Sequence, residues 1–79
     1  MFNMLETFAK ALAAYQRVEI VAFEKVETST ATLPPLVPFF LDLHTVSLHS
    51  VSGATPEGHI VIIEFEEILR VRVLDEKWN

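Results

Sequence analysis

Three histidines are the first candidates for chemistry, because imidazole changes charge near neutral pH and is a common metal ligand. They are His44, His49 and His59, and two of them would have to meet across a hairpin to share a metal ion. The five-residue offset between His44 and His49 places them on opposite faces of a regular strand, unless a bulge intervenes, and matches no metal-binding motif. We therefore expect ordinary surface or strand histidines and no metal site.

Acidic side chains cluster at Glu64, Glu66 and Glu67, where a buried carboxylate with a raised pKa could act as a general acid or base. No oxyanion loop or second polar cluster accompanies them, so a solvated turn is the simpler interpretation. Nearby serines lack a nucleophile elbow; they are Ser47, Ser50 and Ser52. The sequence therefore predicts no catalytic residue and no cofactor, and a small enzyme using Glu64 and Glu66 is the weakest functional hypothesis.

Two arginines, Arg70 and Arg72, share the outward face of the expected last strand. With Lys25 and aromatic stacking, they could bind RNA phosphates. Cross-strand pairing with Glu64 or Glu66 is favoured instead, because eleven acidic side chains outnumber six basic ones. The resulting net charge of -5 disfavours nucleic acid as a partner.

Apolar side chains are more abundant than so small a chain can bury. Hydrophobic residues make up 51% of 79 residues, and small domains are mostly surface. We therefore expect part of this surplus to contact another chain, most simply a second copy in a homo-oligomer, or another protein partner. The candidate interface residues are Phe39, Phe40, Arg70, Arg72 and Trp78.

An amphipathic helix is predicted over residues 4–16, where apolar residues recur at spacings of three and four. Asn3 and Glu6 resemble a capping box at its start. A strand with alternating pattern follows from Arg17, then a polar turn over 27–30. The proline-rich segment 32–38 can occupy only an edge or an extended connection.

The second half of the chain reads as strands separated by clear breaks. Residues 39–51 predict one long bent strand or two short ones, with a bulge near His44. Residues 52–58 contain both glycines and predict a loop. Residues 60–65 are apolar on both faces, which is typical of a strand covered on both sides. A one-turn break over 65–68 precedes a half-exposed strand over 69–74.

This order of elements resembles the small SH3-like barrels of the Sm-like type, which include Hfq- and Rof-like proteins. Residues 42–48 stand where the third Sm-like strand would run, and residues 65–71 resemble the turn between the fourth and fifth strands. In that family the final strand commonly pairs with a neighbouring subunit. Two features depart from the pattern, because residues 34–35 replace the usual glycine of the second strand and the family's RNA-binding residues have no counterpart.

The sequence thus predicts a mainly β fold with one N-terminal helix, as a small, strongly bent antiparallel sheet or SH3-like barrel of about five strands. Residues 1–79 should form a single domain, with a helix over 4–16, a barrel over 17–74 and a short tail over 75–79. No apolar run reaches the length of about 20 residues needed to span a membrane, and no signal peptide is expected. The absence of cysteine is compatible with the expected cytoplasmic location.

The favoured function is a non-enzymatic interaction or regulatory module that self-associates through strand edges and an apolar surface. An Sm-like RNA-binding protein is the alternative.

Overall fold

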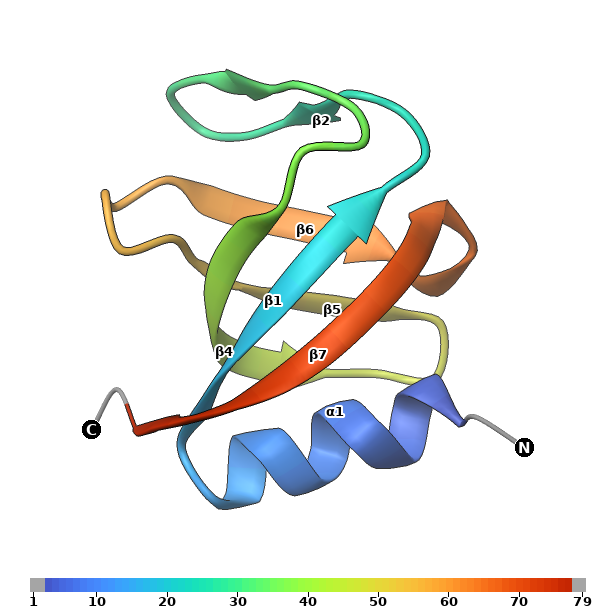
Figure 1. Cartoon of the computed structure of the whole chain (residues 1–79), viewed down its shortest axis with the longest axis vertical. Coiled ribbons are helices and arrows are strands. Elements are labelled where there is room, and N and C mark those ends of the chain that lie inside the picture. Colours follow the sequence, from blue (N-terminus) through green and yellow to red (C-terminus); the bar gives the residue numbers. More distant parts are fainter. Residues whose placement is uncertain (1–2, 78–79) are drawn as a thin grey trace.

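A computed structural model describes residues 3–77 and shows a helix followed by a strongly bent β-sheet (Figure 1). The elements, in chain order, are α1 (Met4–Ala13), β1 (Gln16–Ala22), β2 (Val26–Glu27), β3 (Thr32–Leu33), β4 (Phe39–Val46), β5 (Ser50–Ala54), β6 (Ile60–Glu64), the 3-10 helix η1 (Phe65–Glu67) and β7 (Ile68–Lys77). Trp78, one of the interface candidates, lies outside the described residues.

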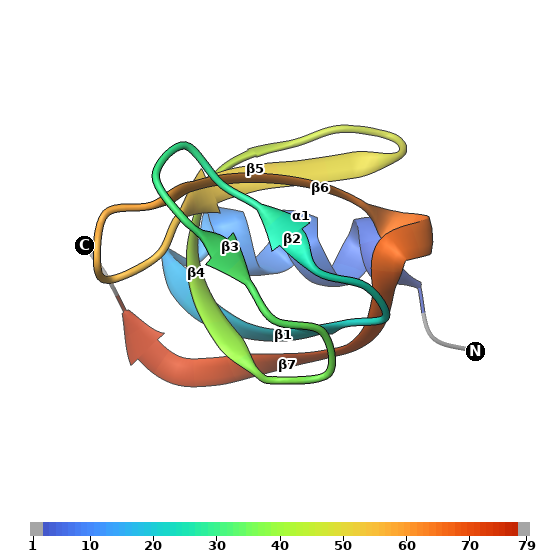
Figure 2. The ribbon, with the colours of Figure 1, turned by 90° about the horizontal axis from the view of Figure 1, so that it is seen from above.

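Five strands form one antiparallel sheet in the order β6-β5-β4-β1-β7, and β2 and β3 form a separate short hairpin. The sheet bends so strongly that β7 and β5 lie on opposite sides of the molecule (Figure 2). Helix α1 covers one end of the bend, and the β2–β3 hairpin lies at the other (Figure 1). The predicted fold class is confirmed as a strongly bent sheet, but β6 and β7 do not pair with each other, so the barrel is not closed.

Helix α1 begins where the sequence predicts. The Glu6 amide donates to Asn3 Oδ1 at 3.1 Å, which satisfies one of the free amides at the helix start. The helix ends at Ala13, three residues before the predicted end. Tyr15 adopts a φ of 56°, and this left-handed residue turns the chain directly into β1.

The core lies between α1 and the inner face of the sheet. Phe8 is fully buried, and its ring stacks on Phe65 of η1 with centroids 5.5 Å apart. The largest fully buried side chains come from the helix and four of the long strands: Phe8, Val18, Ile20, Leu41, Leu43, Val51, Val61 and Ile63. Stacking therefore ties the N-terminal helix to the break between β6 and β7.

Strands β4 and β5 form a hairpin whose register shifts between Leu43 and Thr45, which confirms the predicted bulge near His44. The predicted loop over 52–58 begins too early, because Ser50–Ala54 is strand. A Cβ atom on Gly53 would lie 2.3 Å from the Asp42 carbonyl oxygen, so only glycine fits the close approach of these strands. This glycine belongs to the sheet and not to the turn.

Two further boundaries and one burial pattern differ from the sequence prediction. The predicted turn over 27–30 overlaps the end of β2, and the predicted tail over 75–79 is strand as far as Lys77. Strand β6 is covered on one face only: Val61 and Ile63 are buried, whereas Ile60 and Ile62 are exposed on the outer face. The prolines of 34–38 lie outside all strands, as expected.

Candidate functional site

The two ends of the sheet differ in how much backbone they leave unpaired. Just after β6, the Phe65 amide donates to the His49 carbonyl, whereas the backbone of Ile60 exchanges hydrogen bonds with Ser29. The backbone groups of the odd-numbered residues of β6 therefore point toward β5, and those of the even-numbered residues point away from the sheet. Ser29 occupies both backbone groups of Ile60, at 3.1 Å each, and Glu67 Oε1 accepts from the Glu64 amide at 3.0 Å. Between these two sites, only the outward backbone N–H and C=O groups of Ile62 have no hydrogen-bond partner in the described residues.

Strand β7 keeps a longer free edge. The Phe23 amide donates to Glu67 on the β7 side, and the Ala22 carbonyl accepts from Leu36 on the β4 side, so the odd-numbered residues of β1 face β7. The partners of Glu19 and Val21 in β7 are Arg72 and Arg70. The backbone groups of these two arginines therefore point toward β1.

The backbone groups of Val71 and Val73 consequently point away from the sheet. No hydrogen bond within residues 3–77 occupies them, and Figure 2 shows β7 along one side of the molecule with no element outside it. We call the outward backbone of Val71 and Val73 the β7 edge. It is the longest stretch of unpaired strand backbone in the described sheet, because the β6 edge is reduced to Ile62.

Apolar side chains are exposed along both end strands. Ile60 and Ile62 lie on the outer face of β6, and Ile62 is 71% exposed. Leu69 and Val73 of β7 are 49% and 36% exposed. Val73 lies opposite the buried Val18, so its side chain sits on the core-facing side and loses cover only because the sheet stops there.

The two phenylalanines proposed for the interface have different environments. Phe39 packs in the core at 9% exposure and offers little surface to a partner. Phe40 is 40% exposed and lies on the outer face, directly opposite Glu19. Of this pair, only Phe40 remains available as an interface residue.

The basic candidates are less free than the sequence suggests. Arg72 Nη2 lies 3.2 Å from Glu19 Oε2 on β1, so its partner is not the predicted Glu64 or Glu66. The physical reason is the strand order: β7 pairs with β1 and does not pair with β6. Lys25 Nζ lies 3.9 Å from Glu27 Oε1 at the exposed surface. Within the described chain, Arg70 makes no ion pair.

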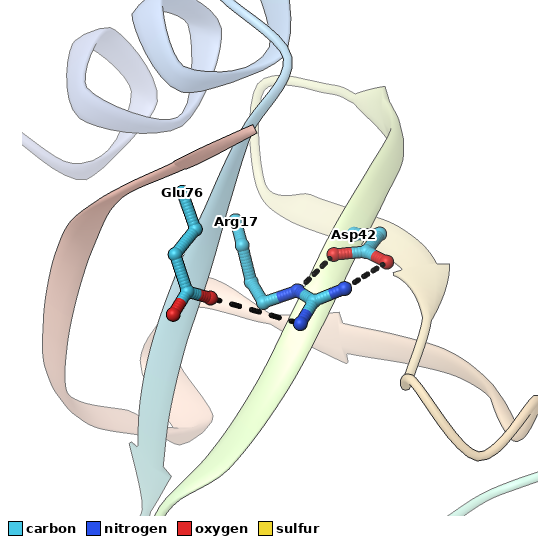
Figure 3. A network of polar contacts seen from close by, with 3 residues as sticks. All are labelled: Arg17, Asp42 and Glu76. Carbon is cyan, nitrogen blue, oxygen red and sulfur yellow. Dashed lines mark hydrogen bonds and ion pairs between the residues drawn. The ribbon is translucent and has the colours of Figure 1, made fainter. Parts of the chain in front are cut away.

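A polar network that the sequence analysis missed crosses β1, β4 and β7 (Figure 3). Arg17 makes two hydrogen bonds to the Asp42 carboxylate, at 2.7 and 3.1 Å, and its Nη1 lies 3.7 Å from Glu76 Oε2. The hydrogen bond that Arg17 donates to Asp42 raises the pKa of the Arg17 guanidinium above its ordinary value, and the negative charges of Asp42 and Glu76 raise it further. Because a raised pKa stabilises the fold below the ordinary arginine value, this contribution persists across the physiological pH range.

Replacing Asp42 with asparagine is expected to lower the free energy of unfolding by about 1–2 kcal/mol, because a partly buried, bidentate pair loses its charge-assisted bonds. Urea denaturation would measure the change. Glu6→Gln is the matched control, since the exposed Glu6–Lys10 pair, 2.9 Å apart, should contribute less than about 0.5 kcal/mol. Equal losses in the two variants would show that the network is merely a surface ion pair.

Two members of the acidic cluster, Glu64 and Glu66, line a hollow of about 300 Å³ together with His49 and Phe65. None of these four side chains is a hydroxyl or thiol nucleophile. The other histidines lie elsewhere: His59 hydrogen-bonds to Thr30, and His44 lies at the β4 bulge. Residues 3–77 contain no group of three metal-ligating side chains positioned to hold an ion.

The described part of the chain also has no helix with the length and hydropathy needed to cross a membrane. Comparisons with protein-family models, curated proteins and solved structures gave no match for this chain.

Proposed function

We propose that this protein is a non-enzymatic interaction module that self-associates through a free strand edge and the apolar side chains beside it. The observation that carries the proposal is the β7 edge, where Val71 and Val73 present backbone groups without a partner in the described residues. Unpaired strand backbone is a template for adding another strand. A second copy of the chain is the partner that supplies such a strand with the fewest assumptions.

The surroundings of the β7 edge support pairing over permanent exposure to water. Natural proteins protect free edges with prolines, charged side chains, β-bulges or a covering loop. Strand β7 contains no proline, and its two register irregularities lie outside the stretch from Val71 to Val73. Its arginines lie on the outer face, so Val71 and Val73 place no charge on the core-facing side. The other end of the sheet has such protection, because Ser29 and Glu67 block β6. Within the described residues, the outward backbone of β6 is therefore largely hydrogen-bonded, whereas that of Val71 and Val73 in β7 is not.

Added strand pairing would also cover apolar surface. Leu69 and Val73 are both partly exposed on the last strand. Each backbone hydrogen bond contributes only about 0.5–1.5 kcal/mol net, so burial of these side chains must supply a large share of the association free energy. We therefore expect reversible self-association, with a dimer fraction that increases with protein concentration.

Val73→Lys is expected to shift the protein toward monomer, because the added charge lies at the β7 edge and must be desolvated when a strand pairs there. Size-exclusion chromatography with light scattering over a concentration series would measure the mass, with circular dichroism to check the fold. Leu48→Lys is the control, since Leu48 is exposed in the β4–β5 turn and belongs to neither end strand. A wild-type protein that stays monomeric throughout would refute the proposal.

A second candidate, an Sm-like RNA-binding protein, is supported by the strand order. The helix precedes the first strand, the last strand lies beside the first, and one helical turn separates the last two strands, as in the family that the sequence resembles. Arg70 is the basic side chain best placed to contact phosphate, since Arg72 and Lys25 already have acidic partners. Salt-sensitive binding of a labelled RNA that weakens in Arg70→Gln would favour this candidate.

A further inference from the structure

We infer that the self-association is like with like: β7 of one copy pairs with β7 of a second copy about a two-fold axis, giving a closed dimer. This inference rests on the proposed function and specifies its partner surface. Two features of the end strands carry it: the face on which their side chains lie, and the blocked backbone of β6. The charges beside β7 oppose it and are considered last.

The face of the sheet on which the edge side chains lie decides which strand pairings are favourable. Residues hydrogen-bonded across an antiparallel pair place their side chains on the same face of the sheet. On β6, the residue with outward backbone is Ile62, and its side chain lies on the outer face. On β7, the residues with outward backbone are Val71 and Val73, opposite the buried Ile20 and Val18, so their side chains lie on the core-facing side.

A head-to-tail contact between β6 and β7 would therefore join the outer face of one copy to the core-facing side of the next. Arg70 and Arg72 of the second copy would then lie on the side where the first copy buries Val61 and Ile63. Charged side chains are costly in such a place. When β7 pairs with β7, the core-facing sides of the two copies lie on the same face of the joined sheet. Val73 of each copy is then covered by the apolar edge residues of the other copy.

The number of unpaired backbone groups also favours pairing of β7 with β7. Strand β6 offers only Ile62, because Ser29 and Glu67 occupy the outward groups on either side of it. Strand β7 offers both Val71 and Val73. Two copies of β7 can thus satisfy twice as many residues as two copies of β6. A two-fold contact also consumes the free edge of both copies, so the assembly stops at two.

Charge beside the dimer axis is the opposing effect. Pairing two β7 strands brings the outer-face arginines of both copies into one row, and like charges directly opposite each other are destabilising. Glu19 offsets this, since its carboxylate already lies 3.2 Å from Arg72 in each copy. Only Arg70 then contributes an unpaired positive charge, in a chain whose net charge is -5.

Single cysteines test the inference directly, because the chain contains none of its own. A two-fold axis through an antiparallel pair places one residue opposite its own copy, with Cβ atoms close enough for a disulfide after small adjustment. The panel is Val71→Cys, Arg72→Cys and Val73→Cys, with Ile62→Cys as the control on β6. Each variant would be oxidised mildly and analysed by non-reducing electrophoresis.

At least one β7 variant is expected to form a covalent dimer on the order of tenfold faster than Ile62→Cys, because pairing raises the effective concentration of the two thiols. Equal or faster cross-linking of Ile62→Cys would overturn the inference. If wild-type masses exceed a dimer, and only the Ile62→Cys, Val73→Cys double variant links into ladders, the pairing is head to tail and the proposed function stands. A wild-type monomer at every concentration would instead refute the proposed function itself.

Discussion

Replacing Gly53 with alanine is expected to lower the free energy of unfolding by about 3 kcal/mol or more. The added Cβ would lie 2.3 Å from the carbonyl oxygen of Asp42 and 3.1 Å from Cα of Leu43. Both atoms belong to the backbone of β4, so no side chain can rotate away. The β4–β5 hairpin must separate instead, and core contacts of Leu43 and Val51 would be lost with it.

Thermal unfolding would measure this loss, with a fall in Tm on the order of 12–24 °C for a domain of this size. Total stability of such a domain is about 4–12 kcal/mol, so the variant could be largely unfolded at room temperature. Ser52→Ala is the control in the same strand. Gly58→Ala adds a second comparison, because Gly58 has a φ of 95° but open space around it. A loss at Gly53 no larger than at Gly58 would mean that backbone freedom, and not contact with β4, explains this glycine.

The second large effect is expected at Phe8. Phe8→Ala should lower the free energy of unfolding by about 3–5 kcal/mol, because it empties a fully buried site and removes the ring stacked on Phe65. The loss falls where α1 meets η1, so helix docking and the β6–β7 break should weaken together. Chemical denaturation followed by circular dichroism would measure it.

Phe23→Ala is the matched control, since it makes the same chemical change at a phenylalanine that is 50% exposed. It should change stability by less than about 1 kcal/mol. If the two variants lost the same amount, α1 would be an appendage of the sheet and not part of its core.

The sequence identified the elements better than their limits. Its helix, its main strands and the bulge near His44 followed from periodicity, which reports the faces that each element buries. The end of α1 at Ala13 depends on the left-handed Tyr15, a conformation for which tyrosine carries no sequence signal. Gly53 was assigned to a loop because glycine commonly marks turns, whereas here it permits a close approach of two strands.

The sequence predicted strand edges and an apolar surface as the interface, and it could not say which strand edge stays free. The surplus of apolar residues pointed to strand edges, yet only the register shows which backbone groups stay unpaired. Arg17 and Asp42 are 25 residues apart in the chain and carry no local motif, so their network depends wholly on β1 lying beside β4. The predicted partner of Arg72 was also wrong, because ion pairs across a sheet depend on which strands are neighbours.

The position of β1 in the sheet has a consequence for folding. β1 is the second element of the chain, but one of its two neighbours is β7, whose residues pair with it up to Lys77. Contacts so distant in sequence form slowly, because a long loop must close before they contribute any stability. During synthesis, one edge of β1 stays unpaired until Ile68–Lys77 has left the ribosome. This interval is when the chain is most exposed to aggregation, and when a chaperone would have the most to protect.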